Sequence, residues 1–349
     1  IQTLAMPAYR AWKRGLVVHA LAQAGVEAEV GPLVDAHGEG RRRATFHARV
    51  RANGRAEVGF MRARAHEIIE IEHCPLLAPS MEGALCAARA LAEVLVATGK
   101  PLDIVVTATG AGLDVDLRGT GALADDMRQA LIEAAGRLDL ARLSNHGETI
   151  IARRQPFLAM GRSTVVPSPG AFLQATAAGE EELASRVCAA VAGRRRVLDL
   201  FAGIGTFALR LAETADVHAV ETDGPALAAL ERAAHATRGL RSVTVERRDL
   251  FRRPLAAEEL GDFDAAVLDP PRAGAEMQAR ALAAAKVAIL ISVSCNAQSF
   301  ARDAAILTRA GYRLLGVTPI DQFRHTHHVE IVGIFEYAKP RGRHRRLLG

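Results

Sequence analysis

The second half of this 349-residue chain is predicted to form an α/β domain with a mostly parallel, Rossmann-like sheet. Short apolar runs of strand length alternate there with amphipathic stretches of helical spacing, which is typical of a doubly wound parallel sheet. The first run begins at Val197 and leads into a turn with Gly203, Gly205 and Ala208, after which a new helical pattern begins. A strand, a glycine-rich turn and a helix in this order indicate a site for a nucleotide-like cofactor.

The later elements follow the same pattern as far as residue 337. Further strands are expected at residues 217–221, 242–249, 263–271, 287–295, 312–320 and 329–337. Helices are expected at residues 225–236, around 276–286 and at 299–311. The last two strands have no helix between them, so they are expected to form an antiparallel pair at one edge of the sheet. A plain dinucleotide-binding fold does not end in this way.

The first half of the chain divides into two smaller parts. Residues 1–29 contain an amphipathic stretch that predicts one helix, and residues 30–165 predict a smaller central α+β domain without a nucleotide motif. The Rossmann-like domain is expected to occupy residues 166–349. A hairpin is expected near residue 54, and the arginines on or beside it are suited as a group to follow a phosphate backbone: Arg49, Arg51, Arg55, Arg62 and Arg64.

Composition and charge favour a folded cytoplasmic protein. Half of the residues are hydrophobic, yet no apolar run is long enough to span a bilayer, and the first residues lack the pattern of a secretory signal. The formal net charge is +5, and only four of the 44 basic residues are lysines. Arginine suits phosphate groups and base edges, so this balance is compatible with an RNA partner and gives no indication of a membrane partner.

Reactive residues stand at the ends of several expected strands. Glu221 ends the second strand, Asp249 the third, Asp269 the fourth and Cys295 the fifth. These side chains are expected to meet at one rim, because parallel strands end at the same edge of a sheet. Glu221 is placed to accept hydrogen bonds from ribose hydroxyls. Cys295 precedes an expected helix, whose N-terminus is expected to lower the pKa of the thiol.

Two cofactors fit this rim. The glycine turn and Glu221 suit NAD(P), which would make the chain an oxidoreductase. The Asp-Pro-Pro sequence from Asp269 and the antiparallel pair favour S-adenosylmethionine. Arg272 follows the prolines where an aromatic residue would stack on an amine-bearing base, so methylation of an exocyclic amine is not favoured. The three histidines before Glu330 lack a recognised ligand spacing, and no metal site is predicted.

Six motifs in this half resemble the RNA (uracil-5-)-methyltransferase family, which forms 5-methyluridine in tRNA and large-subunit rRNA. They are LQA around Gln174, DLFAGIGTF, VETD, LDPPRAG, SVSCN with SFARD after it, and FRHTHHVE. They occur in the family's order, and GFMRARAHEIIEIEHCPLLAP resembles the family's central domain. The resemblance implies a class I S-adenosylmethionine-dependent methyltransferase fold, and an N-terminal helix packed on the catalytic domain.

The resemblance also implies the reaction. Cys295 would be the nucleophile that adds to uracil C6 and thereby activates C5, and Glu330 would accept the proton from C5. A target base would have to leave its stack to reach Cys295. The residues expected at the cofactor are Gln174, Phe201, Gly203, Gly205, Thr206, Glu221, Asp249 and Asp269.

Three features depart from the family's pattern. The N-terminal RNA-binding barrel of many members, the TRAM domain, has no counterpart in this sequence. Iron–sulfur members carry N-terminal cysteines and a fourth one in a C-P-L-L motif, which Cys74 matches. Cys74 alone cannot hold a 4Fe–4S cluster, so a cluster is expected only if the full protein has further N-terminal cysteines. Ala297 stands where the family usually has proline.

The function expected from these residues is S-adenosylmethionine-dependent methylation of uracil C5 in structured RNA, through a covalent cysteine adduct. The C-P-L-L match favours 23S rRNA over tRNA, and a monomer is expected. Two alternatives stay open, an NAD(P)-dependent oxidoreductase and an RNA-binding protein without catalytic activity.

Overall fold

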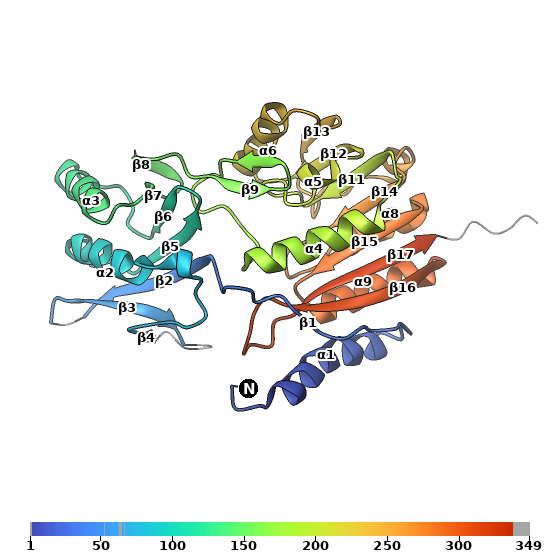
Figure 1. The fold of residues 1–349 in the computed structure, drawn as a ribbon, viewed down its shortest axis with the longest axis horizontal. Helices are drawn as coiled ribbons and strands as arrows, with labels where there is room; N and C mark the ends of the chain where they lie inside the picture. The colour runs from blue at the N-terminus through green and yellow to red at the C-terminus, as the bar shows by residue number, and fades with distance from the viewer. Residues whose placement is uncertain (1, 52, 63–64, 66, 338–349) are drawn as a thin grey trace, which may run out of the picture.

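The computed structural model describes residues 2–51, 53–62, 65 and 67–337, which form two sheets with helices packed on them (Figure 1). The larger sheet has eight strands in the order β1-β16-β17-β15-β14-β11-β12-β13, and the smaller one has seven in the order β4-β3-β2-β5-β6-β7-β8. A short hairpin of β9 (Leu158–Met160) and β10 (Ser163–Val165) lies between them in the chain.

The larger sheet is mostly parallel, as predicted. Its parallel strands are β11 (Arg196–Leu200), β12 (Asp216–Glu221), β13 (Val243–Arg247), β14 (Ala265–Leu268) and β15 (Ile289–Ser294). The predicted antiparallel pair is β16 (Tyr312–Asp321) and β17 (Glu330–Tyr337), and β17 joins the sheet through antiparallel pairing with β15. The short strand β1 (Val34–Asp35) adds a parallel edge outside β16.

Helices cover both faces of this sheet, as a doubly wound fold requires. One core lies under α4 (Ala177–Ala190), α5 (Ala208–Leu211) and α6 (Gly224–Ala236) and includes residues of β9 and β10. The other lies under α1 (Met6–Gln23), α7 (Ala257–Leu260), α8 (Glu276–Ala285) and α9 (Ala297–Arg309). The apolar strands between these layers are buried on both faces, which explains their continuous apolar sequences.

The N-terminal helix α1 packs against α9 and is fixed by a buried polar cluster. Lys13 and Tyr9 are both fully buried, and their side chains hydrogen-bond to the Asp321 carboxylate at the end of β16. Lys13 Nζ also donates to the carbonyl of Phe323 at 3.0 Å. A buried charge is costly unless it is paired and hydrogen-bonded, and this cluster meets both conditions.

The smaller sheet has a core of its own. Its strands are β2 (Arg43–Val50), β3 (Ala56–Met61), β4 (Ile68–Glu70), β5 (Leu102–Thr109), β6 (Gly112–Arg118), β7 (Arg142–Asn145) and β8 (Glu148–Ala152). Helices α2 (Ala84–Val94) and α3 (Asp125–Arg137) pack on one face, and the turns η1 (Pro79–Met81) and η2 (Val96–Thr98) flank α2. Two segments assigned to the central region from sequence, residues 30–35 and 158–165, contact the larger sheet or its core instead.

Candidate active site

The glycine-rich turn joins β11 to α5 and has a left-handed backbone at three residues. Phe201 has φ +63°, Gly203 has φ +55° and Gly205 has φ +99°. The non-glycine Phe201 is the unusual member, since such conformations are rare in L-residues and cluster at functional sites. A Cβ at Gly205 would collide with Leu230 of α6, so this glycine allows close packing of the turn on that helix.

A cavity of about 500 Å³ opens at the carboxyl ends of the parallel strands. Most of the residues expected from sequence line it: Gln174, Phe201, Gly203, Glu221, Asp249, Asp269, Cys295 and Glu330. Gly205 and Thr206 are not among its lining residues. The cavity therefore brings together the ends of β11, β12, β14 and β15 with the first residue of β17.

Glu221 organises the cofactor end of this cavity. One carboxylate oxygen accepts the N–H of Gly203 at 2.9 Å, and the other accepts the N–H groups of Thr222 at 2.6 Å and Asp223 at 2.9 Å. A carboxylate has about four acceptor positions, so a ligand hydroxyl can still donate to it. Glu221 thus fixes the glycine turn and keeps capacity for a ribose.

The strand register places Cys295 beside Glu330. Ser294 of β15 pairs with Ile331 of β17, and the antiparallel direction makes Cys295 and Glu330 the next opposed residues. Asp269 follows Leu268, which pairs with Ser292 of the same β15, so Asp269 lies at the same rim. Asn296 Nδ2 donates to the carbonyl of Arg272 at 3.2 Å and ties the loop after Asp269 to the loop that carries Cys295.

Burial raises the pKa of both carboxyl groups near the nucleophile. The pKa of Asp269 rises to about 7, first through burial and then through the charge of Glu221. The pKa of Glu330, which is 4 % exposed, rises to about 8 through burial and then through Asp269. The charge of Glu221 thus disfavours ionisation of Asp269, and the charge of Asp269 disfavours ionisation of Glu330.

The expectation of a low thiol pKa at Cys295 is wrong. Burial, followed by the charges of Glu330 and Asp269, raises the pKa of Cys295 to about 11. The helix α9 begins directly after it, and Asn296 caps that helix by accepting the N–H of Gln298 at 2.9 Å. The two nearby carboxylates and partial burial therefore outweigh the favourable helix N-terminus.

A chain of hydrogen bonds connects the two carboxyl groups through two glutamines. Gln322, which is fully buried in the loop after β16, hydrogen-bonds to Glu330 and donates from Nε2 to Gln174 Oε1 at 2.7 Å. Gln174 Nε2 in turn donates to Asp269 Oδ2 at 3.3 Å. Gln174 was expected at the site, whereas Gln322 was missed, because nothing in its local sequence distinguishes it from a loop residue.

Several aromatic and charged residues of the cavity were also missed. Phe172 lines its opening and is 70 % exposed, which is unusual for a large apolar side chain. Phe251 lies against Phe201, with ring centroids 5.5 Å apart. Their positions in the sequence could have indicated them, because Phe172 is two residues before Gln174 and Phe251 is two residues after Asp249. The remaining lining residues include Ile204, Asp223, Arg248, Leu250 and Arg272.

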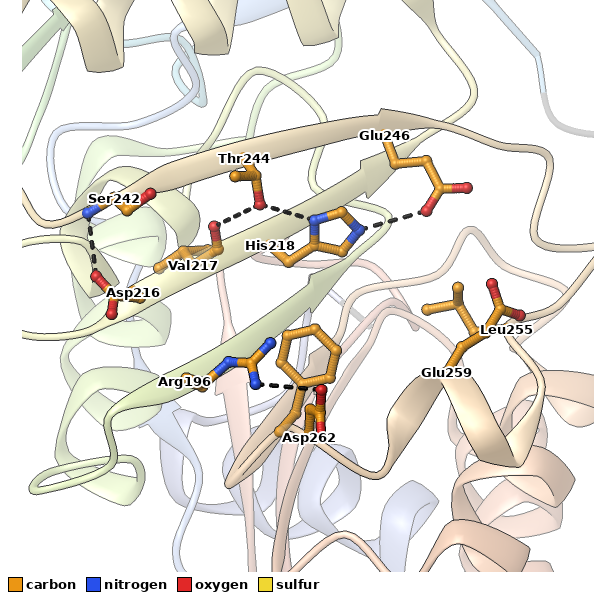
Figure 2. Close-up of a pocket in the computed structure, with 11 residues that line it drawn as sticks. Arg196, Asp216, Val217, His218, Ser242, Thr244, Glu246, Leu255, Glu259 and Asp262 are labelled. Carbon is orange, nitrogen blue, oxygen red and sulfur yellow. Dashed lines mark hydrogen bonds and ion pairs between the residues drawn. The ribbon is translucent and has the colours of Figure 1, made fainter.

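A charged groove of about 430 Å³ lies at the other end of the same strands (Figure 2). It is lined mainly by charged residues, and each ionisable group drawn there has a partner, which for Glu259 is Arg248 outside the picture. Arg196 pairs with Asp262 at 3.3 Å, and His218 lies between Thr244 Oγ1 at 2.8 Å and Glu246 at 3.3 Å. This groove lacks the unpaired buried acids and the cysteine of the first cavity.

Cys74 and the described arginines of the first hairpin are not among the residues that line the first cavity. Within the described ranges, no group of three or more His, Cys, Asp or Glu side chains is placed to hold a metal ion, and Cys74 is a free thiol. Arg51 pairs with Glu57 at 2.8 Å and with Glu70 at 2.7 Å, and Arg62 with Glu67 at 2.7 Å. Arg64 lies outside the described residues.

The comparisons with known proteins agree with this site. A family model described as tRNA (uracil-5-)-methyltransferase matches residues 167–338. An RNA methyltransferase of uncharacterised function from Brucella suis is 48% identical over 326 residues, which are 93% of this chain and 78% of the relative. The 23S rRNA (uracil(1939)-C(5))-methyltransferase RlmD of Halomonas elongata is 33% identical, with 97% of this chain and 74% of that protein covered. The chain belongs to the RNA (uracil-5-)-methyltransferase family.

Membership of this family decides among the functions that the sequence left open. The protein is an S-adenosylmethionine-dependent RNA methyltransferase, and neither an NAD(P)-dependent oxidoreductase nor an RNA-binding protein without activity. The solved structure of a Pyrococcus abyssi tRNA (uracil-54, C5)-methyltransferase in complex with S-adenosyl-L-homocysteine has the same fold. The TM-score is 0.73 at 22% identity, with 96% of this chain and 84% of that one covered.

Among the described residues of the chain, no helix is both long enough and apolar enough to cross a bilayer.

Proposed function

We propose that the protein methylates uracil C5 in structured RNA through a covalent bond between Cys295 and uracil C6. The observation that carries this proposal is the pairing of β15 with β17, which sets Cys295 beside Glu330 at the floor of the cavity. A nucleophile and an acid with a pKa of about 8 in one half-buried site fit a reaction that needs both addition and proton removal.

The donor set of the cavity fits S-adenosylmethionine, which supplies an electrophilic methyl group on a cationic sulfur when bound. Glu221 would accept the ribose hydroxyls, and Phe201 and Phe251 would border the adenine with Leu250. Asp249 and Gln174 add polar groups at the same wall. Asp269 and Glu330 would face the positive charge, which would favour their ionised forms and lower their pKa values.

The protein's own groups then account for the steps at the base. The Cys295 thiol loses its proton to solvent, and Sγ forms a bond to C6 while the electron pair moves to C5 and the carbonyl. Once C5 carries the methyl group, the Glu330 carboxylate takes the C5 proton. The electron pair of that C–H bond restores the C5–C6 double bond, and the Sγ–C6 bond breaks to release the thiolate. Phe172 at the opening is suited to stack on the extruded base.

We further propose 23S rRNA as the substrate rather than tRNA, and a cytoplasmic monomer. Two observations support the rRNA choice, the C-P-L-L sequence at Cys74 and the relative named as a 23S rRNA methyltransferase. The central sheet would position the RNA. Methylation of 23S rRNA fragments and of tRNA transcripts, compared under the same conditions, tests the choice, and light scattering tests the oligomeric state.

Trapping with RNA that contains 5-fluorouridine tests the covalent step. Fluorine at C5 cannot leave as a proton, so the wild-type protein with S-adenosylmethionine should form an adduct that survives denaturing electrophoresis. The Cys295→Ala variant should form none, whereas Cys86→Ala, which removes an exposed cysteine of α2, should trap normally. An equal yield of adduct from Cys295→Ala would show that another residue is the nucleophile.

A further inference from the structure

A second hollow adjoins Cys295 and belongs to a different set of elements. Its volume is about 490 Å³, within the usual range for a small-molecule site. Its walls come from α1, from the start of α9 and from the loop before β17, and they include Trp12, Arg272, Cys295, His327 and His328. It shares only Cys295 and Arg272 with the cofactor cavity.

The two hollows differ in charge. The cofactor cavity is lined by five acidic residues, namely Glu221, Asp223, Asp249, Asp269 and Glu330. No acidic residue is among the described residues that line the second hollow, which instead carries the Arg272 guanidinium at the border between the two. A cationic ligand therefore suits the first hollow, and a ligand with a negative charge suits the second.

The walls of the second hollow present flat rings. Trp12 of α1 faces it on one side, and the rings of His327 and His328 lie together, with centroids 4.2 Å apart. Burial, followed by the neighbouring charges of His327 and Arg272, lowers the pKa of His328 to about 4. His328 is therefore a neutral ring at pH 7, and unpaired RNA bases stack on such aromatic and imidazole surfaces.

The rings are held in place before any ligand binds. His328 lies edge-on against Phe323 at 5.7 Å between centroids, and the Arg41 guanidinium covers Phe323 at 5.2 Å. On the opposite wall, the Tyr9 hydroxyl accepts the backbone N–H of His325 at 3.1 Å and ties α1 to the histidine loop. A site whose walls are already fixed loses little conformational entropy when a ligand binds.

We propose that this hollow binds the nucleotide next to the target uridine, with its base between Trp12 and the two histidines and its phosphate near Arg272. The inference rests on the proposed function, because Cys295 places the target uracil at the border of both hollows. When a base is extruded to Cys295, its neighbour in the chain must be unstacked too. The second hollow would stabilise that neighbour and so favour the extruded state.

The fluorescence of the single tryptophan reports on this site directly. Trp12 is the only tryptophan of the chain, so its emission can be followed without any label. The probe is the shortest RNA hairpin that the wild-type protein methylates, used without S-adenosylmethionine. This RNA should quench the emission, and S-adenosyl-L-homocysteine alone should not. Hairpins with an abasic residue on either side of the uridine are then compared, and one of the two should lose the quenching. Quenching that neither abasic residue alters would overturn the proposal.

Kinetics of matched variants give the second test. Trp12→Ala and His328→Ala should raise the KM for the hairpin about 5- to 100-fold, the range expected for loss of one stacked base, with the KM for S-adenosylmethionine unchanged. Trp12→Phe keeps a ring and should recover most of the loss. Val18→Ala changes an exposed residue on the same helix, outside the lining of the hollow, and should behave as wild type.

The outcomes separate this inference from the function on which it rests. If the wild-type protein neither methylates nor traps any RNA, the proposed function itself fails. If the wild-type protein is active and Trp12→Ala, folded as judged by thermal unfolding, keeps its KM for RNA, only the nucleotide site is refuted. The abasic hairpin should lose activity with wild type but lose no further activity with Trp12→Ala, and additive losses would also refute the site.

Discussion

The two ends of the catalytic sheet are formed by the same strands but differ in how their charged side chains are paired. At the amino ends, Arg196 and His218 have close partners in an open groove (Figure 2). At the carboxyl ends, Asp269 and Glu330 are acids without a basic ion-pair partner and with raised pKa values. Exposed ion pairs are a common feature of protein surfaces and contribute little to stability. Acids whose pKa values are raised to about 7 and 8 instead indicate a catalytic role or a cationic ligand.

Replacing Glu330 should produce the largest effect. Glu330→Gln keeps the shape and the contact with Gln322 but cannot accept a proton, so turnover should fall about 10²- to 10⁴-fold. Because addition precedes proton removal, this variant should accumulate the covalent adduct on ordinary, unfluorinated RNA. Asp262→Asn makes the same change from carboxylate to amide at the opposite end of the sheet and should alter methylation rates less than twofold. An equal loss in both variants would contradict the distinction between the two ends.

Gln322 should have the next largest effect, as a positioning residue. Gln322→Leu removes the hydrogen bonds that join Glu330 to Gln174, and we expect kcat/KM to fall about tenfold. The contact with Gln322 lowers the pKa of Glu330, so its loss should move the acid limb of the pH–rate profile to higher pH. A variant that loses activity with an unchanged profile would show a role in packing alone.

The raised pKa values also predict how stability depends on pH. Asp269 and Glu330 hold their protons to a higher pH in the folded protein than in the unfolded chain, whose ordinary values are 3.8 and 4.5. Their contribution to stability is therefore complete below those values and is lost as the pH rises toward about 7 and 8. Chemical denaturation at a series of pH values should show this decline, and Asp269→Asn should make it shallower.

The raised pKa values of Asp269 and Glu330 also predict how cofactor binding depends on pH. A cationic sulfonium favours ionised Asp269 and Glu330, so S-adenosylmethionine should bind several-fold more tightly relative to the uncharged thioether S-adenosyl-L-homocysteine as the pH rises. Calorimetry in buffers of different ionisation enthalpy measures the protons released by each ligand. Equal proton release by both ligands would contradict a carboxylate pair that faces the sulfur.

The smallest effect is expected at the amino ends of the strands. Asp262→Asn breaks the solvent-exposed pair with Arg196, and exposed pairs contribute less than about 1 kcal/mol to stability. Thermal unfolding should therefore change little, and methylation not at all. A marked loss of activity in Asp262→Asn would assign a functional role to the groove in Figure 2.

Much of the cofactor side of the site could be read from the sequence because it depends on strand ends. Glu221 ends a strand, and Asp269 and Cys295 each follow a strand that is mostly apolar. Parallel pairing alone brings the three residues to one rim. The antiparallel pair at the end of the chain could be expected from the missing helix between β16 and β17.

Other properties depend on contacts between distant segments and could not be predicted. The thiol pKa of Cys295 was expected to be low, because the adjacent helix is visible in the sequence and the opposed Glu330 is not. Gly205 was expected at the cofactor, but its neighbour is Leu230 of α6. Trp12 and Gln322 come from opposite ends of the chain, and the buried contacts of α1 with the loop after β16 bring their segments together.

The buried contact between Lys13 and Asp321 has a consequence for synthesis of the protein on the ribosome. The two residues are separated by 308 positions, so at about 5 to 20 residues per second α1 waits roughly 15 to 60 seconds for its partner. During that time Val17 and Leu21, buried in the finished protein, have no β16–β17 pair to shelter them. The Lys13 ammonium likewise stays in water until the Asp321 carboxylate is made. The contact that fixes α1 on the sheet can therefore form only after Asp321 has been translated.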